Sequence, residues 1–352
     1  MAGAVTVRDV ARLASVSAST VSRALSASEL VAPHTRDRIL AAAAQLGYSA
    51  NTSARSLITG RTSNFGLVVP DLENPYFASV TKGVQSRALG EGFAVFVADS
   101  DEDVRTEIEL VRKLASQVDG LILCSPRMSD RDLAEVTEST TVVLVNRQLP
   151  RIQSITVDDN EIVRQALGHL YALGHRSIAY AGGPATSWSD GQRREGIRSA
   201  LSNLPGLEVA EIGSFRPVFG GGLPAADLAV ATGATAVLAY NDLMALGILS
   251  RLQARGIKVP DDMSVVGIDD VSAATLVSPA LTTVRAPLRK VGIAAVDALI
   301  DSIFPDRPPL PPETLPVELI VRASTSVPSR SAMPLTSREE AGLDERSSNA
   351  HQ

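Results

Sequence analysis

The chain has 352 residues, 45% of them hydrophobic, and a formal net charge of −6, with a single cysteine at Cys124. This length allows more than one domain with its own core, the lone cysteine excludes an intrachain disulfide, and we find neither a signal peptide nor the roughly 20-residue apolar run that a membrane helix needs. We therefore expect a cytoplasmic protein without a membrane segment.

The N-terminal part of the chain is basic and is predicted to hold three short helices. Residues 1 to 61 carry seven arginines against three acidic residues, so they sum to +4 and the other 291 residues to −10. Thr6 starts a capping box before the first helix, and Ser17 is a good N-cap for a second helix over about 18 to 25. Pro33 suits the first turn of a third helix and Gly47 its end. A basic segment on an acidic chain suggests that this segment alone meets a polyanion.

The first two predicted helices have the spacing of a helix-turn-helix. Ala11, Ser15 and Val21 are small enough for the helices to cross closely, although Ser15 stands where glycine is usual and must tolerate or avoid a positive φ. In a major groove, short hydroxyls can donate to phosphates while a long arginine reaches a base edge. We assign phosphate contacts to Ser17, Thr20 and Ser22 and base readout to Ala18, Ser19 and Arg23, and we count Thr6 with this DNA-binding set. The alternative is a purely structural three-helix bundle with a serine-rich cap.

The stretch from TVRDVARLASVSASTVSRAL through LGYSANTSARSLITGRTSNFGLVVPDLENPYF resembles the LacI/GalR family of bacterial transcription regulators. The resemblance implies that residues 51 to 57, within a hinge segment over 50 to 62, become a short hinge helix only on operator DNA, paired across a dimer in the minor groove. Leu57 would be wedged into the central base step, bending the duplex. It also implies DNA contacts from Tyr48, Asn51, Ala54 and Arg55. The chain departs from the family at Ala50, where proline usually stands, and NTSARSLITG alone would be interpreted as a polar linker.

From Phe65 onward, short β-rich runs alternate with helical patterns. The runs are FGLVVPD, FAVFVAD, GLILCS and TVVLVN, followed by SIAYAGG, AVLAYN and SVVGIDD, with LTTVRAP and VELIVRAST as late strands. This rhythm predicts an α/β body of parallel sheets covered by helices on both faces. The two sets divide near residues 157 to 160, which predicts two doubly wound lobes with ligand chemistry at the carboxyl ends of the strands. The family resemblance, over residues 5 to 328, implies a periplasmic-binding-protein-like body.

We predict four segments along the chain. A helix-turn-helix DNA-binding domain spans residues 1 to 49, the hinge 50 to 62, a two-lobed effector-binding and dimerisation domain 63 to 328, and a disordered tail 329 to 352. The N-lobe comprises about 63 to 157 plus 287 to 316, and the C-lobe about 158 to 286 plus 317 to 328. Because the polar tail lacks the leucine heptads through which some family members tetramerise, a homodimer on a pseudo-palindrome is favoured.

Polar side chains follow the ends of several predicted strands. Carboxylates, amides and arginines that converge between aromatic walls are the chemistry of a sugar or nucleoside site. The resemblance implies effector contacts from Tyr76, Phe77, Asn146, Arg193, Phe215, Asn241 and Asp269, with Trp188 as a further platform. Taken singly, each residue also fits a helix cap or a surface contact. Ala286 replaces a longer polar residue of several sugar-binding members, so the effector's identity stays open.

Enzyme chemistry has little support in the sequence. The four histidines lack metal-ligand spacing, and neither a nucleophile elbow nor a phosphate-binding loop appears, so we expect no catalytic residue, metal or cofactor. We predict a DNA-binding transcriptional repressor that binds operator DNA as a dimer and is controlled by a mono- or oligosaccharide effector in the interlobe cleft. Whether the effector induces or corepresses is open. The alternatives are a nucleoside- or purine-responsive regulator of the same fold, and a sugar-binding receptor without specific DNA function.

Overall fold

The computed structural model describes residues 5 to 26, 31 to 48, 61 to 304 and 313 to 329. The chain divides into two compact units, residues 1 to 64 with 117 to 119, and residues 65 to 116 with 120 to 352. The predicted hinge residues Asn51, Ala54, Arg55 and Leu57 and almost all of the predicted tail lie outside the described residues. Each unit is described by itself below, and we call the helical part of the first unit the head and the second unit the body.

The head contains the three helices that the sequence predicts, α1 Val7–Leu13, α2 Ala18–Ser26 and α3 Pro33–Leu46. The Thr6 backbone and hydroxyl both donate to the Asp9 carboxylate, at 2.9 and 2.7 Å, which confirms the capping box. Ser15 has a φ of 50° and Gly47 a φ of 64°, so the turn and the end of α3 both use the left-handed region. Fully buried apolar side chains from all three helices form the core, namely Val10, Val21 and Ile39.

The N-lobe of the body is a six-stranded sheet in the order β11-β5-β4-β3-β1-β2, in which the strands from β11 to β1 are parallel. Its central strands are apolar on both faces because helices cover both faces. The strands are β1 Asn64–Val69, β2 Ala94–Asp99, β3 Gly120–Cys124, β4 Val142–Val145, β5 Gln153–Val157 and β11 Glu313–Leu315; the helices are α5 Pro75–Gly90, α6 Val104–Ala115, α7 Asp130–Thr137 and α13 Leu288–Ile303.

The C-lobe repeats this plan with a second six-stranded sheet, in the order β12-β10-β9-β8-β6-β7, in which only β12 runs antiparallel, against β10. Its strands are β6 Ser177–Gly182, β7 Glu208–Ser214, β8 Ala236–Ala239, β9 Ser264–Asp269, β10 Thr282–Arg285 and β12 Glu318–Ile320; its helices are α8 Asp159–Ala172, α9 Trp188–Leu201, α10 Phe219–Ala231, α11 Asp242–Ala254 and α12 Ala273–Leu276. The predicted α/β architecture of two doubly wound lobes is therefore confirmed.

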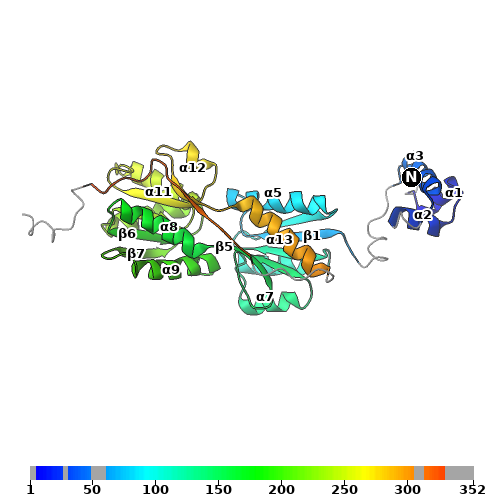
Figure 1. Ribbon diagram of the computed structural model, residues 1–352, viewed down its shortest axis with the longest axis horizontal. Coiled ribbons are helices and arrows are strands. Elements are labelled where there is room, and N and C mark those ends of the chain that lie inside the picture. The colour runs from blue at the N-terminus through cyan, green and yellow to red at the C-terminus, as the bar shows by residue number, and fades with distance from the viewer. Residues whose placement is uncertain (1–4, 27–30, 49–60, 305–312, 330–352) are drawn as a thin grey trace, which may run out of the picture. The chain divides into compact units, whose positions relative to one another are not determined.

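The chain passes between the two lobes three times, from β5 to α8, from β10 to α13 and from β11 to β12 (Figure 1). The second crossing brings α13 alongside α5, although two hundred residues separate them in sequence. A Cβ added at Gly83 or Gly292 would overlap the backbone of the facing helix, so this close approach depends on glycine. The three crossings join the two lobes. The carboxyl ends of the strands of each lobe face those of the other lobe across a cleft.

Candidate functional site

The N-terminal turn of α2 carries a cluster of hydroxyl groups. The Ser17 oxygen lies 2.8 Å from the Ser19 oxygen and 2.7 Å from the Thr20 oxygen, and it accepts the Thr20 backbone amide at 3.1 Å. Ser17, Ser19 and Arg23 are exposed, whereas Ala18, Thr20 and Ser22 are half-buried. The amino end of a helix, with its partial positive charge and short hydroxyls, suits a phosphate oxygen, and the exposed arginine one turn later has the reach to touch a base edge.

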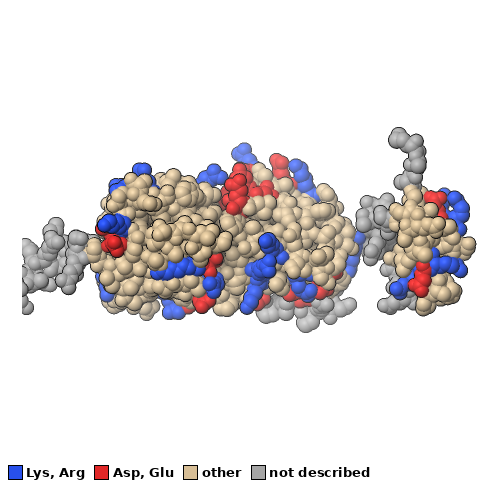
Figure 2. All heavy atoms as spheres, turned by 90° about the horizontal axis from the view of Figure 1, so that it is seen from above, with Lys and Arg blue, Asp and Glu red and all other residues tan. Residues whose placement is uncertain are grey.

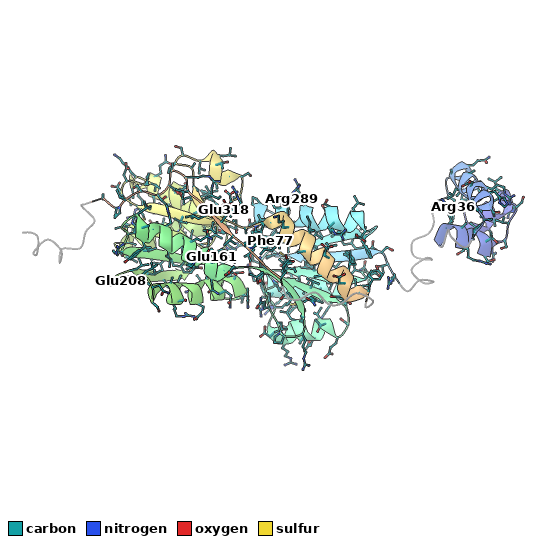
Figure 3. The ribbon with its side chains drawn as sticks, viewed as in Figure 1. Arg36, Phe77, Glu161, Glu208, Arg289 and Glu318 are labelled. Atoms are coloured by element: carbon teal, nitrogen blue, oxygen red, sulfur yellow. The ribbon has the colours of Figure 1, made fainter. Side chains whose placement is uncertain are left out.

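The charges of the head also fit contact with DNA. Among its described residues 5 to 26 and 31 to 48, five arginines stand against two aspartates (Figure 2). Figure 3 shows one of them, Arg36, on α3. Thr6 is exposed, but its hydroxyl already donates to Asp9, and Tyr48 is half-buried against the head's core. Thr6 and Tyr48 therefore have structural roles within the head, in addition to the DNA contacts predicted for them.

Within the body, a cavity lies between the lobes, and six of the seven predicted effector residues line it: Tyr76, Phe77, Asn146, Arg193, Asn241 and Asp269. Figure 3 marks Phe77 on the N-lobe beside the C-lobe. The volume of the cavity that the centre of a water molecule could occupy is about 30 Å³, which is room for about two waters.

The N-lobe wall of the cleft is built on the start of α5 and the end of β4. Asn74 caps α5 by accepting the Tyr76 amide at 3.0 Å, which aims Tyr76 and Phe77 at the cavity with their rings edge to face, 5.0 Å apart. The Asn146 amide nitrogen donates to the Tyr76 hydroxyl at 2.6 Å and to the Ser125 hydroxyl at 3.0 Å. The Asn146 side-chain oxygen is buried and has no partner among the described residues, so it is an acceptor that a ligand hydroxyl can satisfy.

The C-lobe wall centres on Arg193, which α9 places inside the lobe. Its Nε donates to the Asp159 carboxylate at 2.8 Å and its Nη1 to the Tyr240 carbonyl at 2.5 Å, while its guanidinium lies 4.8 Å from the centre of the Tyr240 ring. Burial lowers the pKa of Arg193, but the surrounding negative charges, with Asp159 foremost among them, together outweigh this and the net direction is upward. Arg193 is therefore a fixed cation held against the cleft.

Two further C-lobe residues occupy strand ends, as the doubly wound plan requires. Asn241 follows β8 and caps α11 by accepting the Met244 amide at 2.9 Å, while its own amide donates to the Pro217 carbonyl at 2.8 Å. Asp269 ends β9 with a φ of 118°, a strained conformation for a non-glycine residue of the kind found at binding sites. Burial raises the pKa of Asp269 well above its ordinary value.

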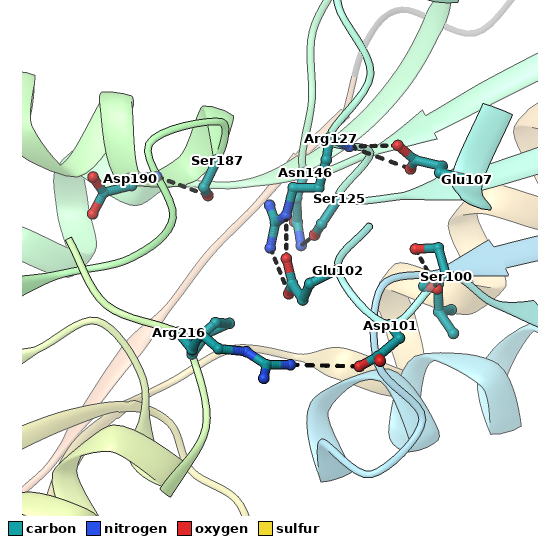
Figure 4. A network of polar contacts seen from close by, with 12 residues as sticks. Ser100, Asp101, Glu102, Glu107, Ser125, Arg127, Asn146, Ser187, Asp190 and Arg216 are labelled. Carbon is teal, nitrogen blue, oxygen red and sulfur yellow. Dashed lines mark hydrogen bonds and ion pairs between the residues drawn. The ribbon is translucent and has the colours of Figure 1, made fainter. Parts of the chain in front are cut away.

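The structure also shows cleft residues that the sequence reasoning missed. Arg127, just after β3, donates its Nε and Nη2 to both carboxylate oxygens of Glu102, at 2.6 and 2.9 Å (Figure 4). Glu107 on α6 accepts the backbone amides of Arg127 and Met128, each at 2.9 Å, and so fixes the loop that carries Arg127. Glu102 and Arg127 follow strands β2 and β3, so the strand-end rule used for the other residues could have found them. The cavity is further lined by Asn74, Ser125, Ser189 and Tyr240.

Two predicted aromatic contacts are not part of this cavity as it stands. Phe215 is half-buried and packs against the C-lobe core around Ala225 and Met244, and Trp188 is half-buried at the first turn of α9; neither lines the cavity. The backbone amide of Phe215 donates to the Gly182 carbonyl at 3.0 Å, which holds this residue beside the end of β6. The stacking role of Phe215 stays a prediction.

Residues 5 to 26, 31 to 48, 61 to 304 and 313 to 329 contain no cluster of histidine, cysteine and acidic side chains suited to a metal ion. The described helices include none that is both long and apolar enough to cross a membrane. Burial raises the pKa of Cys124 to about 12, so this thiol stays protonated, as expected for a core residue.

Comparison with known proteins agrees with both the helix-turn-helix head and the two-lobed body. Residues 6 to 51 match the model of "Bacterial regulatory proteins, lacI family", and residues 167 to 325 match that of a "Periplasmic binding protein-like domain". An HTH-type transcriptional regulator from the aml 5′ region of Streptomyces limosus is 35% identical over 331 residues, which cover 90% of this chain and 93% of that one.

Two solved structures extend the likeness to three dimensions. The Lac repressor dimer bound to operator and the anti-inducer ONPF has 29% identity and a TM-score of 0.82, over 92% of this chain and all of that one. The transcriptional regulator CelR in complex with cellobiose has 30% identity and a TM-score of 0.68, over 91% and 99% of the two chains. This chain therefore belongs to the lacI family of bacterial regulatory proteins, whose members are DNA-binding transcription regulators and not enzymes.

Proposed function

We propose that the protein is a cytoplasmic repressor that binds a pseudo-palindromic operator as a homodimer and is controlled by a mono- or oligosaccharide in the interlobe cleft. The observation that carries the proposal is the presence, in one chain, of a basic helix-turn-helix and of a polar cleft between the two lobes of the body. An effector acts only if it binds the two states of lobe closure unequally, and any change that it makes in operator affinity has a reciprocal change in effector affinity.

The DNA half of the proposal rests on α2 and on the hinge. The exposed Ser17, Ser19 and Arg23 would contact phosphates and a base edge, together with Ala18, Thr20 and Ser22. Residues 50 to 62, with Asn51, Ala54, Arg55 and Leu57, would form the minor-groove hinge. We propose the domain division into residues 1 to 49, 50 to 62, 63 to 328 and 329 to 352 on the same basis.

A sugar effector is supported by the donors and acceptors of the cleft. The unpartnered oxygen of Asn146, the carboxyl of Asp269 and the guanidinium of Arg193 face a cavity with the Tyr76 and Phe77 rings on one side. Hydroxyl-rich rings need such paired acceptors and donors together with an apolar wall. The cellobiose bound by the similar regulator CelR is consistent with this class of ligand.

A homodimer is supported by apolar side chains left on the surface of the body. Leu72, Leu89 and Phe96 of the N-lobe are 41%, 76% and 44% exposed, and Phe219 and Leu276 of the C-lobe 46% and 82%. A groove of mostly apolar walls on the C-lobe includes Phe219, Leu249, Val277 and Pro279, and Leu276 directly precedes Val277 in the chain. Exposed apolar side chains that lie together are typical of surfaces that a partner covers.

Selection from random-sequence duplexes tests the proposal directly. Full-length protein is incubated with a duplex library, and bound DNA is sequenced with and without a panel of sugars and nucleosides. We expect enrichment of a palindrome and a shift of its occupancy by a sugar. If the palindrome is enriched but only nucleosides shift its occupancy, the effector is a nucleoside and not a sugar. No enrichment under any condition would contradict the DNA-reading role of the head.

A further inference from the structure

The charged side chains around the cleft are matched, cation to carboxylate. Arg127 binds Glu102 with two parallel hydrogen bonds, and the side chains of this pair are only 2% and 11% exposed. Arg193 binds Asp159, and these side chains are 7% and 2% exposed. Asp269 adds a third carboxyl to the same walls. The two guanidinium groups at the cleft therefore face carboxyl groups that already neutralise them.

From this arrangement we propose that Glu102 sets the charge selectivity of the cleft, so that the site takes an uncharged effector and rejects acidic or phosphorylated compounds of the same shape. The inference rests on the proposed function only in taking the cleft as the ligand site. Glu102 is then a specificity-determining residue, and Glu107 is a positioning residue that acts through the loop carrying Arg127.

The physical reason is the cost of an unmatched charge in a buried site. A buried arginine with nothing opposite it is a strong site for carboxylate or phosphate, because its planar fork binds two oxygens at once. Here Glu102 already occupies Nε and Nη2 of Arg127. A ligand anion would have to displace that carboxylate or remain uncompensated beside it, and both are costly away from water.

The loop carrying Arg127 keeps the pair in place. The Arg127 and Met128 backbone amides both donate to the buried Glu107 carboxylate, so the guanidinium cannot easily move away from Glu102 (Figure 4). The remaining polar groups of the wall also favour a neutral ligand. The unpartnered Asn146 side-chain oxygen is an acceptor, so it binds a ligand hydroxyl group and disfavours an anionic oxygen.

Inorganic phosphate is the first probe, with the midpoint of thermal unfolding of the full-length chain as the measurement. We expect no saturable effect on the wild type, and a gain in phosphate affinity of about tenfold or more for Glu102→Gln, because a charge-assisted bond to Arg127 becomes available. The double variant Glu102→Gln, Arg127→Met should lose that gain. The control is Glu195→Gln, which breaks the exposed Glu195–Arg198 pair on α9 and should match the wild type.

Matched sugars are the second probe: glucose with glucuronate, and galactose with galacturonate. Wild-type protein should prefer the neutral member of any pair that binds, and Glu102→Gln should shift the ratio toward the acid by about tenfold or more. The proposal is overturned if wild-type protein binds phosphate or an acidic sugar as well as Glu102→Gln does. If Glu102→Gln does not fold, the wild-type titrations decide alone: saturable phosphate binding overturns the proposal and its absence supports it. Failure of operator selection would instead count against the proposed function, because none of these titrations uses DNA.

Discussion

The head and the cleft present their polar groups in opposite ways. At the start of α2, Ser17, Ser19 and Arg23 are exposed, and the hydrogen bonds of Ser17 go to neighbours two or three residues away. In the cleft, Arg127 and Arg193 are buried and bind carboxylates 25 and 34 residues away in sequence. Exposed donors suit a large polyanion whose phosphates come to them, whereas buried matched charges suit a small ligand that must be surrounded.

The largest effect should come from breaking a buried pair of the cleft. Arg193→Met leaves Asp159 buried without its cation, so we expect the free energy of unfolding to fall by about 3–5 kcal/mol. Urea unfolding followed by circular dichroism measures it. The matched control is Arg198→Met, because the Arg198–Glu195 pair is exposed and should contribute little. Equal losses in the two variants would contradict the contrast between buried and exposed pairs.

The next effect concerns base readout by the head. Arg23→Ala should reduce discrimination at one base pair of each half-site by about 1–3 kcal/mol, because a bidentate contact to a base edge is lost. Competition binding against single-base operator variants measures this. Arg36→Ala removes an exposed arginine from α3 and should leave the base preference unchanged. An unaltered preference in Arg23→Ala would remove this residue from the readout set.

A smaller effect separates the two roles assigned to Ser17. Ser17→Ala should lower the stability of the head by about 0.5–2 kcal/mol, because the Thr20 amide loses its cap. Ser17→Asp keeps a capping oxygen but adds negative charge where a phosphate is expected. Thermal unfolding together with operator titration should therefore show normal stability and weaker DNA binding for Ser17→Asp. Normal operator affinity in that variant would place Ser17 away from the DNA backbone.

The last prediction concerns a pH dependence of the body. Burial raises the pKa of Asp242 from 3.8 to about 7, and it does so beside Asp269, whose pKa is also raised. The folded protein thus keeps a proton that the unfolded chain releases, so this stability is present at low pH and is lost as pH rises toward 7. The two carboxyls titrate as a pair.

The comparison of wild type with Asp242→Asn isolates that dependence. Urea unfolding between about pH 4 and pH 8 should show the wild-type free energy of unfolding falling relative to the variant as pH rises. Thr283 and Val271 both donate to Asp242, so the variant also loses some stability at every pH, which shifts the curve without tilting it. A constant difference across the range would contradict the raised pKa.

The head could be predicted almost completely from the sequence because its signals are local. Caps and helical spacing placed the second helix over about 18 to 25, and α2 spans Ala18–Ser26. In the body the runs of apolar residues indicated the central strands. Three strands were missed, namely β5, β7 and β11. β7 and β11 lie at sheet edges with exposed positions, and Gln153, Ser154 and Thr156 interrupt β5, so none carries a long apolar run.

The cleft was predictable only in part, since its contacts join distant segments. The strand-end rule and the family resemblance together brought Tyr76, Asn146 and Asp269 to one cavity. The pairing of Glu102 with Arg127 needs β2 and β3 to be placed in space first, because the two residues come from different loops. The direction of the Phe215 ring depends on C-lobe packing, which no local pattern encodes.

The central claim is that ligand in the cleft and operator on the head are linked in one molecule. The most direct measurement is the operator affinity of the full-length protein with and without a saturating sugar, paired with the sugar affinity with and without operator. We predict the same fold-change in both, of about 5-fold to 150-fold if the coupling is typical. A sugar that binds the cleft tightly and leaves operator affinity unchanged would contradict the account.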